Sequence, residues 1–294
     1  MSSSILNKSY IYSIDSGTYL VKTNSTIKLS PSSYSHVALS TSHYAASKNS
    51  TLYISSLVSN HSAQLSLPLV ISSIQWCSLL LVVSTLDKTY IISKDGGILR
   101  DFIPGIIASN SFLWPSLFIW NNNSLNVCIL PYLSHLDQEK LPDLRDGSYW
   151  TDQLINHHEQ QLEQHKGISY PLKGTLSTLF TSLINVESEL ENVLHMATKS
   201  NETFMFLFSL SPNSVSISVI EYLDPIWPNK TFDIPKLYTL SKISIPIENG
   251  RLRVDPQYDR IYAFNETSVF MIDFQNILKN QKPTLEWIVD VTDL

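Results

Sequence analysis

Residues 154–165 read LINHHEQQLEQH, which places three histidines and two glutamates in a short stretch. Zinc enzymes use such residues as His-Glu-x-x-His on a helix, where two imidazoles bind one metal and the glutamate is the base. Here Leu162 occupies the position of the second ligand after His158-Glu159. His158 and His165 are roughly 10 Å apart along a helix axis, too far to share one zinc. We expect no metal here and interpret the histidines as the polar edge of a helix.

Other catalytic signatures are missing from the sequence. The only adjacent glycines, Gly96 and Gly97 in KDGGIL, are typical of a hairpin turn and not of a phosphate-binding loop. No Gly-x-Ser-x-Gly nucleophile motif occurs among the many serines. An acidic stretch is most simply a solvated linker; its carboxylates are Asp137, Glu139, Asp143 and Asp146. The sequence therefore predicts a protein that is not an enzyme and needs no cofactor.

The composition favours short strands and argues against nucleic acid as a ligand. Charged residues make up 16% of the 294-residue chain, and Ser, Thr and Asn supply most of the polarity. The formal net charge is -6 without a block of Lys and Arg, so we expect no direct nucleic-acid binding. The start, MSSSILNKSYIYS, lacks the pattern of a secretory signal, which predicts an intracellular protein of the nucleus or cytoplasm. Cys77 and Cys128 lie in apolar runs and are expected to be buried.

One uncharged run raises the alternative of a membrane-associated protein. Residues 59–86 contain no charged side chain, and LPLVISSIQWCSLLLVVS is nearly long enough to cross a bilayer. Its serines, its proline and its clusters of β-branched residues fit two adjacent strands better. We therefore predict no membrane span.

A repeated turn-and-strand pattern organises most of the chain. The segments SGTYLV, NSTLYI, DKTYII, NNSLNV, PNSVSI and ETSVFM each combine a polar turn, a hydroxyl residue and a short apolar strand. The first three intervals between the hydroxyl residues are 33, 38 and 35 residues, and an apolar strand precedes most of the turns. Such regularity predicts one hairpin-containing unit repeated along the chain. The six hydroxyl anchors are Thr18, Thr51, Thr89, Ser124, Ser214 and Ser268.

These segments resemble the WD-repeat β-propeller family, whose blades carry a turn and third strand of the form Asp-Gly-Thr-Val-x-Ile-Trp-Asp-Leu. ETSVFMIDF (266–274) is similar, with Ile272 at the Trp position and Asp273 at the Asp position. NSTLYISSL (49–57) and NSLNVCIL (123–130) follow the same pattern. The sequence has no Gly-His or Trp-Asp pair, so the resemblance implies a degenerate propeller. It covers residues 10–132 and 200–290.

The fold expected from this resemblance is an all-β propeller with a helical insertion. Six anchors imply six blades, or seven if YIYSI (10–14) and LEWIVDV (285–291) pair to close the ring. The alternative is a β-sandwich or barrel of similar strand spacing. The predicted organisation is a first group of blades in 1–133, a helical insertion and linker in 134–200, and a second group in 201–294.

The insertion supplies the residues that we expect to contact a partner. After Gly174, apolar residues recur every three or four positions as far as Leu194, which predicts an amphipathic helix. Together with 154–165 it would form a helical hairpin. Trp114 and Trp120 are expected to be core residues, whereas Trp150 and Trp227 stand beside turn and loop residues. The predicted partner-binding residues are Leu176, Leu179, Phe180, Leu183, Leu190, Trp150 and Trp227.

Three functions follow from these observations. We favour a noncatalytic scaffold for protein-protein interactions, a subunit of a larger intracellular complex whose partners are other protein subunits. The second is a propeller hydrolase with carboxylates converging at the central channel. The third is a membrane-associated protein that uses the uncharged run 59–86.

Overall fold

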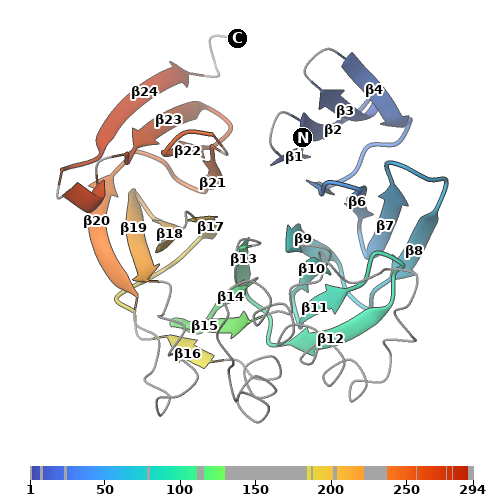
Figure 1. Ribbon diagram of the computed structural model, residues 1–294, viewed down its shortest axis with the longest axis horizontal. Helices are drawn as coiled ribbons and strands as arrows, with labels where there is room; N and C mark the ends of the chain where they lie inside the picture. Colours follow the sequence, from blue (N-terminus) through green and yellow to red (C-terminus); the bar gives the residue numbers. More distant parts are fainter. Residues whose placement is uncertain are drawn as a thin grey trace, which may run out of the picture. The chain divides into compact units, whose positions relative to one another are not determined.

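The computed structural model of the chain describes residues 2–6, 9–22, 25–77, 80–110, 116–129, 184–186, 188–200, 204–221, 237–255, 257–275, 277–279 and 281–290. These residues form six four-stranded sheets (Figure 1). Each sheet contains four strands that follow one another in the sequence, in the order first, second, third, fourth. This meander is the repeating unit of a β-propeller, and the sheets are called blades 1 to 6 in chain order.

The first of two compact units includes Met1–Gly105 and contains blades 1 to 3. Its strands are β1 (Ser2–Leu6), β2 (Ser9–Ile14), β3 (Gly17–Lys22) and β4 (Ser25–Ser30) in blade 1; β5 (His36–Leu39), β6 (His43–Lys48), β7 (Thr51–Ser56) and β8 (Ser62–Ser66) in blade 2; and β9 (Ile71–Cys77), β10 (Leu80–Thr85), β11 (Thr89–Ile92) and β12 (Ile98–Phe102) in blade 3.

The second unit includes Ile106–Leu113, Leu117–Cys128 and Ser182–Leu294 and contains blades 4 to 6. Its elements are β13 (Ile106–Asn110), β14 (Ser116–Asn121), β15 (Ser124–Ile129) and β16 (Ile184–Val186) in blade 4; β17 (His195–Ser200), β18 (Phe204–Ser211), β19 (Ser214–Glu221) and β20 (Tyr238–Ser244) in blade 5; and β21 (Arg251–Val254), β22 (Arg260–Phe264), β23 (Ser268–Asp273), the 3-10 helix η3 (Ile277–Lys279) and β24 (Thr284–Asp290) in blade 6.

The six predicted anchors mark the third strand of every blade. Five of them are the first residue of that strand, and Thr18 is the second residue of β3. The turns before them contain Asn49, Asn122, Asn123 and Asn213, all with positive φ. Asparagine adopts this backbone conformation more readily than most residues, which explains the amide-rich turns. The predicted hairpins are therefore confirmed.

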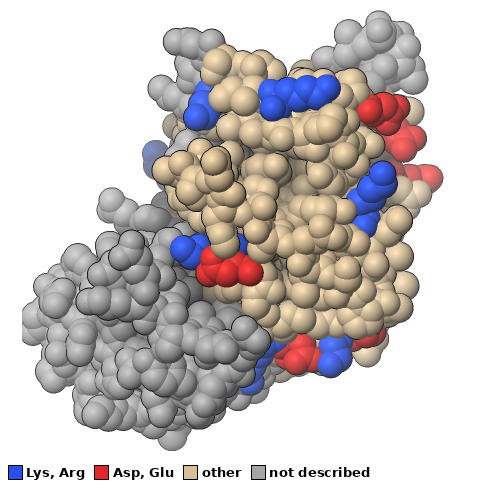
Figure 2. Space-filling view, turned by 90° about the vertical axis from the view of Figure 1, so that its right-hand side faces the viewer, with Lys and Arg blue, Asp and Glu red and all other residues tan. Residues whose placement is uncertain are grey.

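Buried hydroxyl groups tie the hairpins to the segments that lead to the next blade. In blade 1, Ser13 Oγ lies 2.9 Å from Thr18 Oγ1, and Thr18 donates to the backbone oxygen of Ser32 at 3.0 Å. In blade 3, Ser84 Oγ lies 3.2 Å from Thr89 Oγ1 and donates to the backbone oxygen of Gly105 at 3.3 Å. A hydroxyl group that has a hydrogen-bond partner can be buried at little cost. Ser and Thr side chains can therefore donate hydrogen bonds to backbone oxygens in a chain that has few charged residues. On the side that holds β8 and β12, charged side chains are scattered among uncharged ones (Figure 2).

Within each unit, the cores lie between neighbouring blades. Blades 1 and 2 share one apolar cluster and blades 2 and 3 share another. In the second unit, one cluster joins blades 4 and 5, and a larger one joins blades 5 and 6. Strand β18 packs Leu207 into the first of these and Phe206 and Phe208 into the second. A strand with two buried faces needs apolar residues at successive positions, as in MFLFSL.

The uncharged run 59–86 forms strands. It contains β8, β9 and β10, and no helix among the described residues is long and apolar enough to span a membrane. Cys77 and Cys128 are buried, as expected.

The predicted closure of the ring by YIYSI and LEWIVDV is wrong. YIYSI lies in β2, whose two edges are already paired with β1 and β3. Residues 285–290 of LEWIVDV lie in β24, which pairs with β23 in blade 6. The described sheets number six, each with its own four strands, so the seven-bladed and the sandwich or barrel alternatives are also wrong.

The helical prediction fails where the structure describes the insertion. Residues 184–186 and 195–200 are strands β16 and β17. Between them, Asn192 has a φ of 48°, a left-handed conformation that is incompatible with a continuing helix. Val186, Leu190 and Val193 are nevertheless buried in one cluster. Their helix-like spacing does mark buried positions, but these positions lie on a strand and an irregular segment and not on a helix. The remainder of the predicted hairpin, including the histidines of 154–165, lies outside the described residues.

Candidate functional site

Strand β24, the outer strand of blade 6, combines an unpaired edge with exposed apolar side chains. It is last in the strand order of its sheet, so one edge pairs with β23 and the other has no strand beside it in the described structure. Leu285, Trp287 and Ile288 are 39%, 60% and 44% exposed. Large aromatic side chains bury 150–250 Å² when covered and dominate interface energetics, so an exposed tryptophan on an edge strand is a candidate contact residue.

The register of β23 with β24 explains why these side chains are exposed. Leu285 lies opposite Ile272, and Trp287 lies opposite Phe270. Ile272 and Phe270 are buried in the core shared by blades 5 and 6, so Leu285 and Trp287 extend the same apolar face outward. A register shift between Val269 and Phe270 then leaves Ile288 as an extra residue in the outer strand. The three residues are called the β24 edge.

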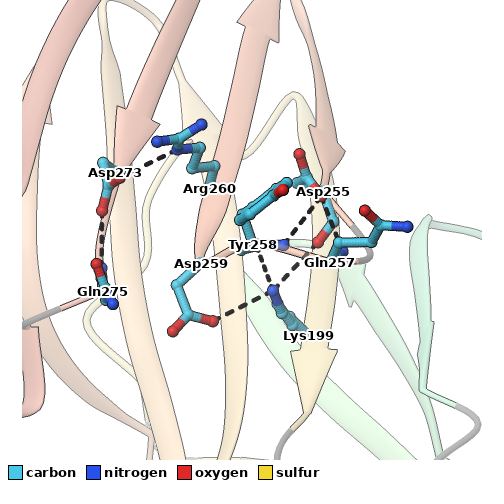
Figure 3. Close-up of polar contacts among 8 residues, drawn as sticks. All are labelled: Lys199, Asp255, Gln257, Tyr258, Asp259, Arg260, Asp273 and Gln275. Carbon is cyan, nitrogen blue, oxygen red and sulfur yellow. Dashed lines mark hydrogen bonds and ion pairs between the residues drawn. The ribbon is translucent and has the colours of Figure 1, made fainter.

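A network of hydrogen bonds and ion pairs joins the turn between β21 and β22 of blade 6 to strand β17 of blade 5 (Figure 3). Lys199 on β17 donates through Nζ to the backbone oxygens of Asp255, at 3.1 Å, and Tyr258. The same ammonium lies 3.2 Å from Asp259 Oδ1 and 5.8 Å from the centre of the Phe274 ring. Lys199 of blade 5 thus binds both ends of the turn between β21 and β22.

The turn also satisfies its own backbone. Asp255 Oδ1 accepts from the backbone nitrogens of Gln257 and Tyr258, at 2.8 and 3.0 Å (Figure 3). Burial, and then the charge of Asp255, raise the pKa of the Tyr262 hydroxyl, which donates to Asp255 Oδ2 at 3.5 Å. The turn is held from blade 5 by Lys199 and from within by Asp255. These bonds fix the position at which β22 begins.

Strands β22 and β23 are joined by an ion pair close to this turn. Arg260 Nε lies 3.1 Å from Asp273 Oδ2, and these two residues are paired in the strand register. The hydrogen bond that Arg260 donates to Asp273 raises the pKa of Arg260. Asp273 Oδ1 also accepts from the backbone nitrogen of Gln275 at 3.1 Å. Asp273 is the residue that matches the aspartate of the WD-repeat pattern, and here it binds both the Arg260 side chain on β22 and the backbone that follows β23. The network therefore supports β23, against which β24 is paired.

Removal of the Lys199 ammonium should destabilise the second unit. The Lys199 side chain is only 16% exposed, and Lys199→Met keeps most of its length while deleting every hydrogen bond that it donates. We expect the free energy of unfolding to fall by about 1–2 kcal/mol, because its carbonyl acceptors lose their partner. Chemical denaturation followed by circular dichroism measures this. Lys242→Met, at an exposed site on β20, is the matched control; equal losses in the two variants would contradict the assigned role.

The structure describes only one of the seven predicted partner-binding residues. Leu190 is 7% exposed and packs in the core shared by blades 4 and 5, where it contributes to packing. The other six, Leu176, Leu179, Phe180, Leu183, Trp150 and Trp227, lie outside the described residues. Trp120 is buried as predicted, and Trp114 lies outside them.

Sequence reasoning missed the β24 edge. The stretch LEWIVD carries apolar residues on both faces of a strand, whereas a half-buried outer strand usually alternates apolar and polar residues. That departure from alternation was the available signal. Within the described part of the chain, no group of three or more His, Cys, Asp or Glu residues could hold a metal ion.

Comparison with known proteins identifies the fold. No protein-family model and no curated protein sequence matches the chain. A chain of the yeast heterotrimeric Nup82–Nup159–Nup116 nucleoporin complex matches 98% of this chain and 89% of its own, with a TM-score of 0.61 and 10% identity. Hsv2 of Kluyveromyces lactis matches 99% of this chain and 98% of its own, with a TM-score of 0.49 and 9% identity. The chain of the nucleoporin complex is a β-propeller protein, and the likeness to it, together with the six four-stranded sheets, shows that this chain has the fold of a six-bladed β-propeller.

Proposed function

We propose that the protein is a noncatalytic subunit of an intracellular multiprotein complex, nuclear or cytoplasmic, and that it binds a protein partner through the β24 edge. The observation that carries this proposal is the 60% exposure of Trp287 on a strand whose outer edge pairs with no described strand. The likeness in fold to a chain of a three-protein nucleoporin complex is consistent with such a role.

The chemistry of the β24 edge favours an extended segment of the partner. Unpaired N–H and C=O groups along an edge strand can pair with an added strand, which supplies affinity through the backbone. Side chains of the added strand would then pack against Leu285 and Trp287 on one face. Soluble proteins usually protect long apolar edges with charge, and Glu286 is the one charged residue among 284–288. A strand from a partner would pair with this edge and bury its exposed apolar side chains.

Trp287→Asp should weaken this contact by roughly thirtyfold or more while leaving the blade folded. Because Trp287 is mostly exposed, its replacement costs little core packing, whereas a hot-spot tryptophan contributes about 2 kcal/mol or more to binding, roughly thirtyfold in Kd. The parent chain and the variant are each purified by affinity from the cells that produce the protein. Proteins that co-purify in stoichiometric amounts are then quantified by mass spectrometry.

The matched control is Ile27→Asp, on the outer strand β4 of blade 1 and 44% exposed. A partner that is lost with Trp287→Asp and retained with Ile27→Asp supports the proposal. Retention with both variants contradicts it. Light scattering on the purified chain detects the case in which the partner is a second copy.

The predicted helical hairpin is a separate proposed contact, with its own test. Leu179→Asp with Leu183→Asp would break the apolar stripe read from the sequence. Loss of a partner in this variant, and not in Trp287→Asp, would assign that partner to the insertion and not to the β24 edge.

A further inference from the structure

Two exposed lysines lie just ahead of strand β24. Lys279 is the last residue of the 3-10 helix η3, and Lys282 stands two residues before Thr284, the first residue of the strand. Both side chains are exposed. A polypeptide spans at most about 3.6 Å per residue, so Lys282 lies no more than about 7 Å from the start of β24. The two ammonium groups therefore belong to one end of the β24 edge.

The core shared by blades 5 and 6 fixes the segment that carries Lys279. The side chains of Phe274 and Ile277 are buried in this core, and the backbone nitrogen of Ile277 donates to the backbone oxygen of Phe274 at 3.0 Å. Leu285 and Trp287 lie opposite other residues of the same core and extend it outward. Helix η3 and the exposed apolar side chains of β24 are thus on the same face of blade 6.

Positive charge predominates at this end of the strand. Glu286 is the one acidic residue in the sequence between 275 and 288, and alternation places it on the face opposite Leu285. There the hydrogen bond that Arg260 donates to Asp273 is the main cause that raises the pKa of Arg260, and the charge of Glu286 adds to it. The carboxylate of Glu286 therefore acts on a cation of its own blade, on the side away from the apolar face.

A strand added to this edge would bring its own side chains beside the lysines. When a segment pairs with an edge strand, one of its ends lies next to the first residues of that strand. A carboxylate at that end would meet the ammonium groups of Lys279 and Lys282, whereas a basic residue there would be repelled. Opposite charges across an interface select the partner and speed its approach. The edge thus specifies the charge of its partner as well as its extended conformation.

We propose that the segment that pairs with the β24 edge belongs to another protein and is acidic at the end beside Lys279 and Lys282. Apolar side chains at alternate positions of the segment pack on Leu285 and Trp287. This inference rests on the proposed function, because it names the chemistry of the partner that the same edge binds. A second copy of the chain is the competing occupant, and the test distinguishes it.

Cross-linking without a spacer locates the acidic residues. A water-soluble carbodiimide joins an amine directly to a carboxylate that touches it. The affinity-purified full chain, with its bound partner, is treated with this reagent, and the joined peptides are identified by mass spectrometry. We expect Lys279 or Lys282 to be joined to an Asp or Glu of the partner that Trp287→Asp releases. A covalent dimer of this chain through either lysine would overturn the proposal.

Charge reversal measures the contribution of the lysines. Lys279→Glu with Lys282→Glu turns two attractions into repulsions, so we expect recovery of the partner to fall about tenfold at about 0.1 M salt. At about 1 M salt, where the Debye length is about 3 Å, the parent and this variant should differ less than about twofold. Lys22→Glu with Lys48→Glu is the matched control: it makes the same change in net charge at exposed lysines of blades 1 and 2 and should recover the partner as the parent does.

Failure of this proposal differs from failure of the function on which it rests. If Trp287→Asp loses a partner that Lys279→Glu with Lys282→Glu recovers in full, the β24 edge binds that partner and the acidic segment is wrong. The acidic segment is also wrong if the control variant loses the partner as strongly as the charge reversal beside β24. If Trp287→Asp retains the partner, the function proposed for the edge is itself wrong.

Discussion

Phe208→Ala should lower the free energy of unfolding by about 3–5 kcal/mol. The Phe208 side chain is fully buried, and its ring centre lies 4.9 Å from that of Phe274 and 6.2 Å from that of Phe206. Phe208 and Phe206 lie on β18 of blade 5, whereas Phe274 follows β23 of blade 6. The substitution would leave a cavity between two blades and remove both aromatic contacts.

The measurement is urea denaturation of the purified chain, followed by far-ultraviolet circular dichroism and by tryptophan fluorescence. Tyr238→Ala is the control, since this exposed aromatic on β20 should change stability by only about 0.5 kcal/mol. If Phe208→Ala unfolds at the same urea concentration as the parent, the packing between blades 5 and 6 described here is incorrect.

Acidification should weaken the fold through His195. Its pKa is about 4 in the folded chain, against 6.5 for an ordinary histidine, because burial and two arginines disfavour its charged form. Between these values the unfolded chain holds a proton that the folded chain lacks, so stability is lost as the pH falls from 6.5 to 4. The full loss is about 3 kcal/mol, at 1.36 kcal/mol for each unit of pKa difference.

Comparison with His195→Gln isolates this effect from the carboxylates that titrate in the same range. Glutamine cannot gain a proton, so the free energy of unfolding of the variant should fall less between pH 6.5 and pH 4. Denaturation midpoints across this range provide the measurement. Parallel pH profiles for the parent and the variant would show that His195 is not held neutral by its surroundings.

The blade pattern could be predicted from the sequence because its determinants are local. Tight hairpins favour turn residues that tolerate positive φ, and such a residue directly precedes or lies within two positions of four of the six anchors, Thr18, Thr51, Ser124 and Ser214. Asn213 before Ser214 is an example. The anchors therefore located the third strand of every blade, even without the tryptophan and glycine signatures of the WD-repeat family.

The helix prediction failed over 184–194 because spacing alone does not specify backbone geometry. Val186, Leu190 and Val193 recur at helical intervals, yet the backbone that buries them is a strand followed by an irregular segment. That segment is fixed by tertiary bonds: the backbone nitrogen of Leu194 donates to Leu210, and Ser211 Oγ donates to the backbone oxygen of Glu191. A distant strand supplies both bonds, so local periodicity could not reveal them.

The candidate sites depend on contacts between residues that are far apart in the sequence. Lys199 precedes Asp255 by 56 residues, and the adjacency of β17 and β21 lets its ammonium reach the backbone oxygen of Asp255. The exposure of Trp287 likewise depends on its position in the last strand of its sheet, since the same sequence in a central strand would be covered on both edges.

The consecutive order of strands within each blade has a consequence for how the chain folds during synthesis. Every strand pair of blades 1 to 3 joins neighbouring strands, so these sheets can form soon after their own residues leave the ribosome, at roughly 5–20 residues per second. Blade 4 differs, because Leu125 on β15 pairs with Val186 on β16. Among the described strand pairs, that of β15 with β16 therefore has the longest delay, some sixty further residues, and during this time the edge of β15 is open to wrong pairing or to a chaperone.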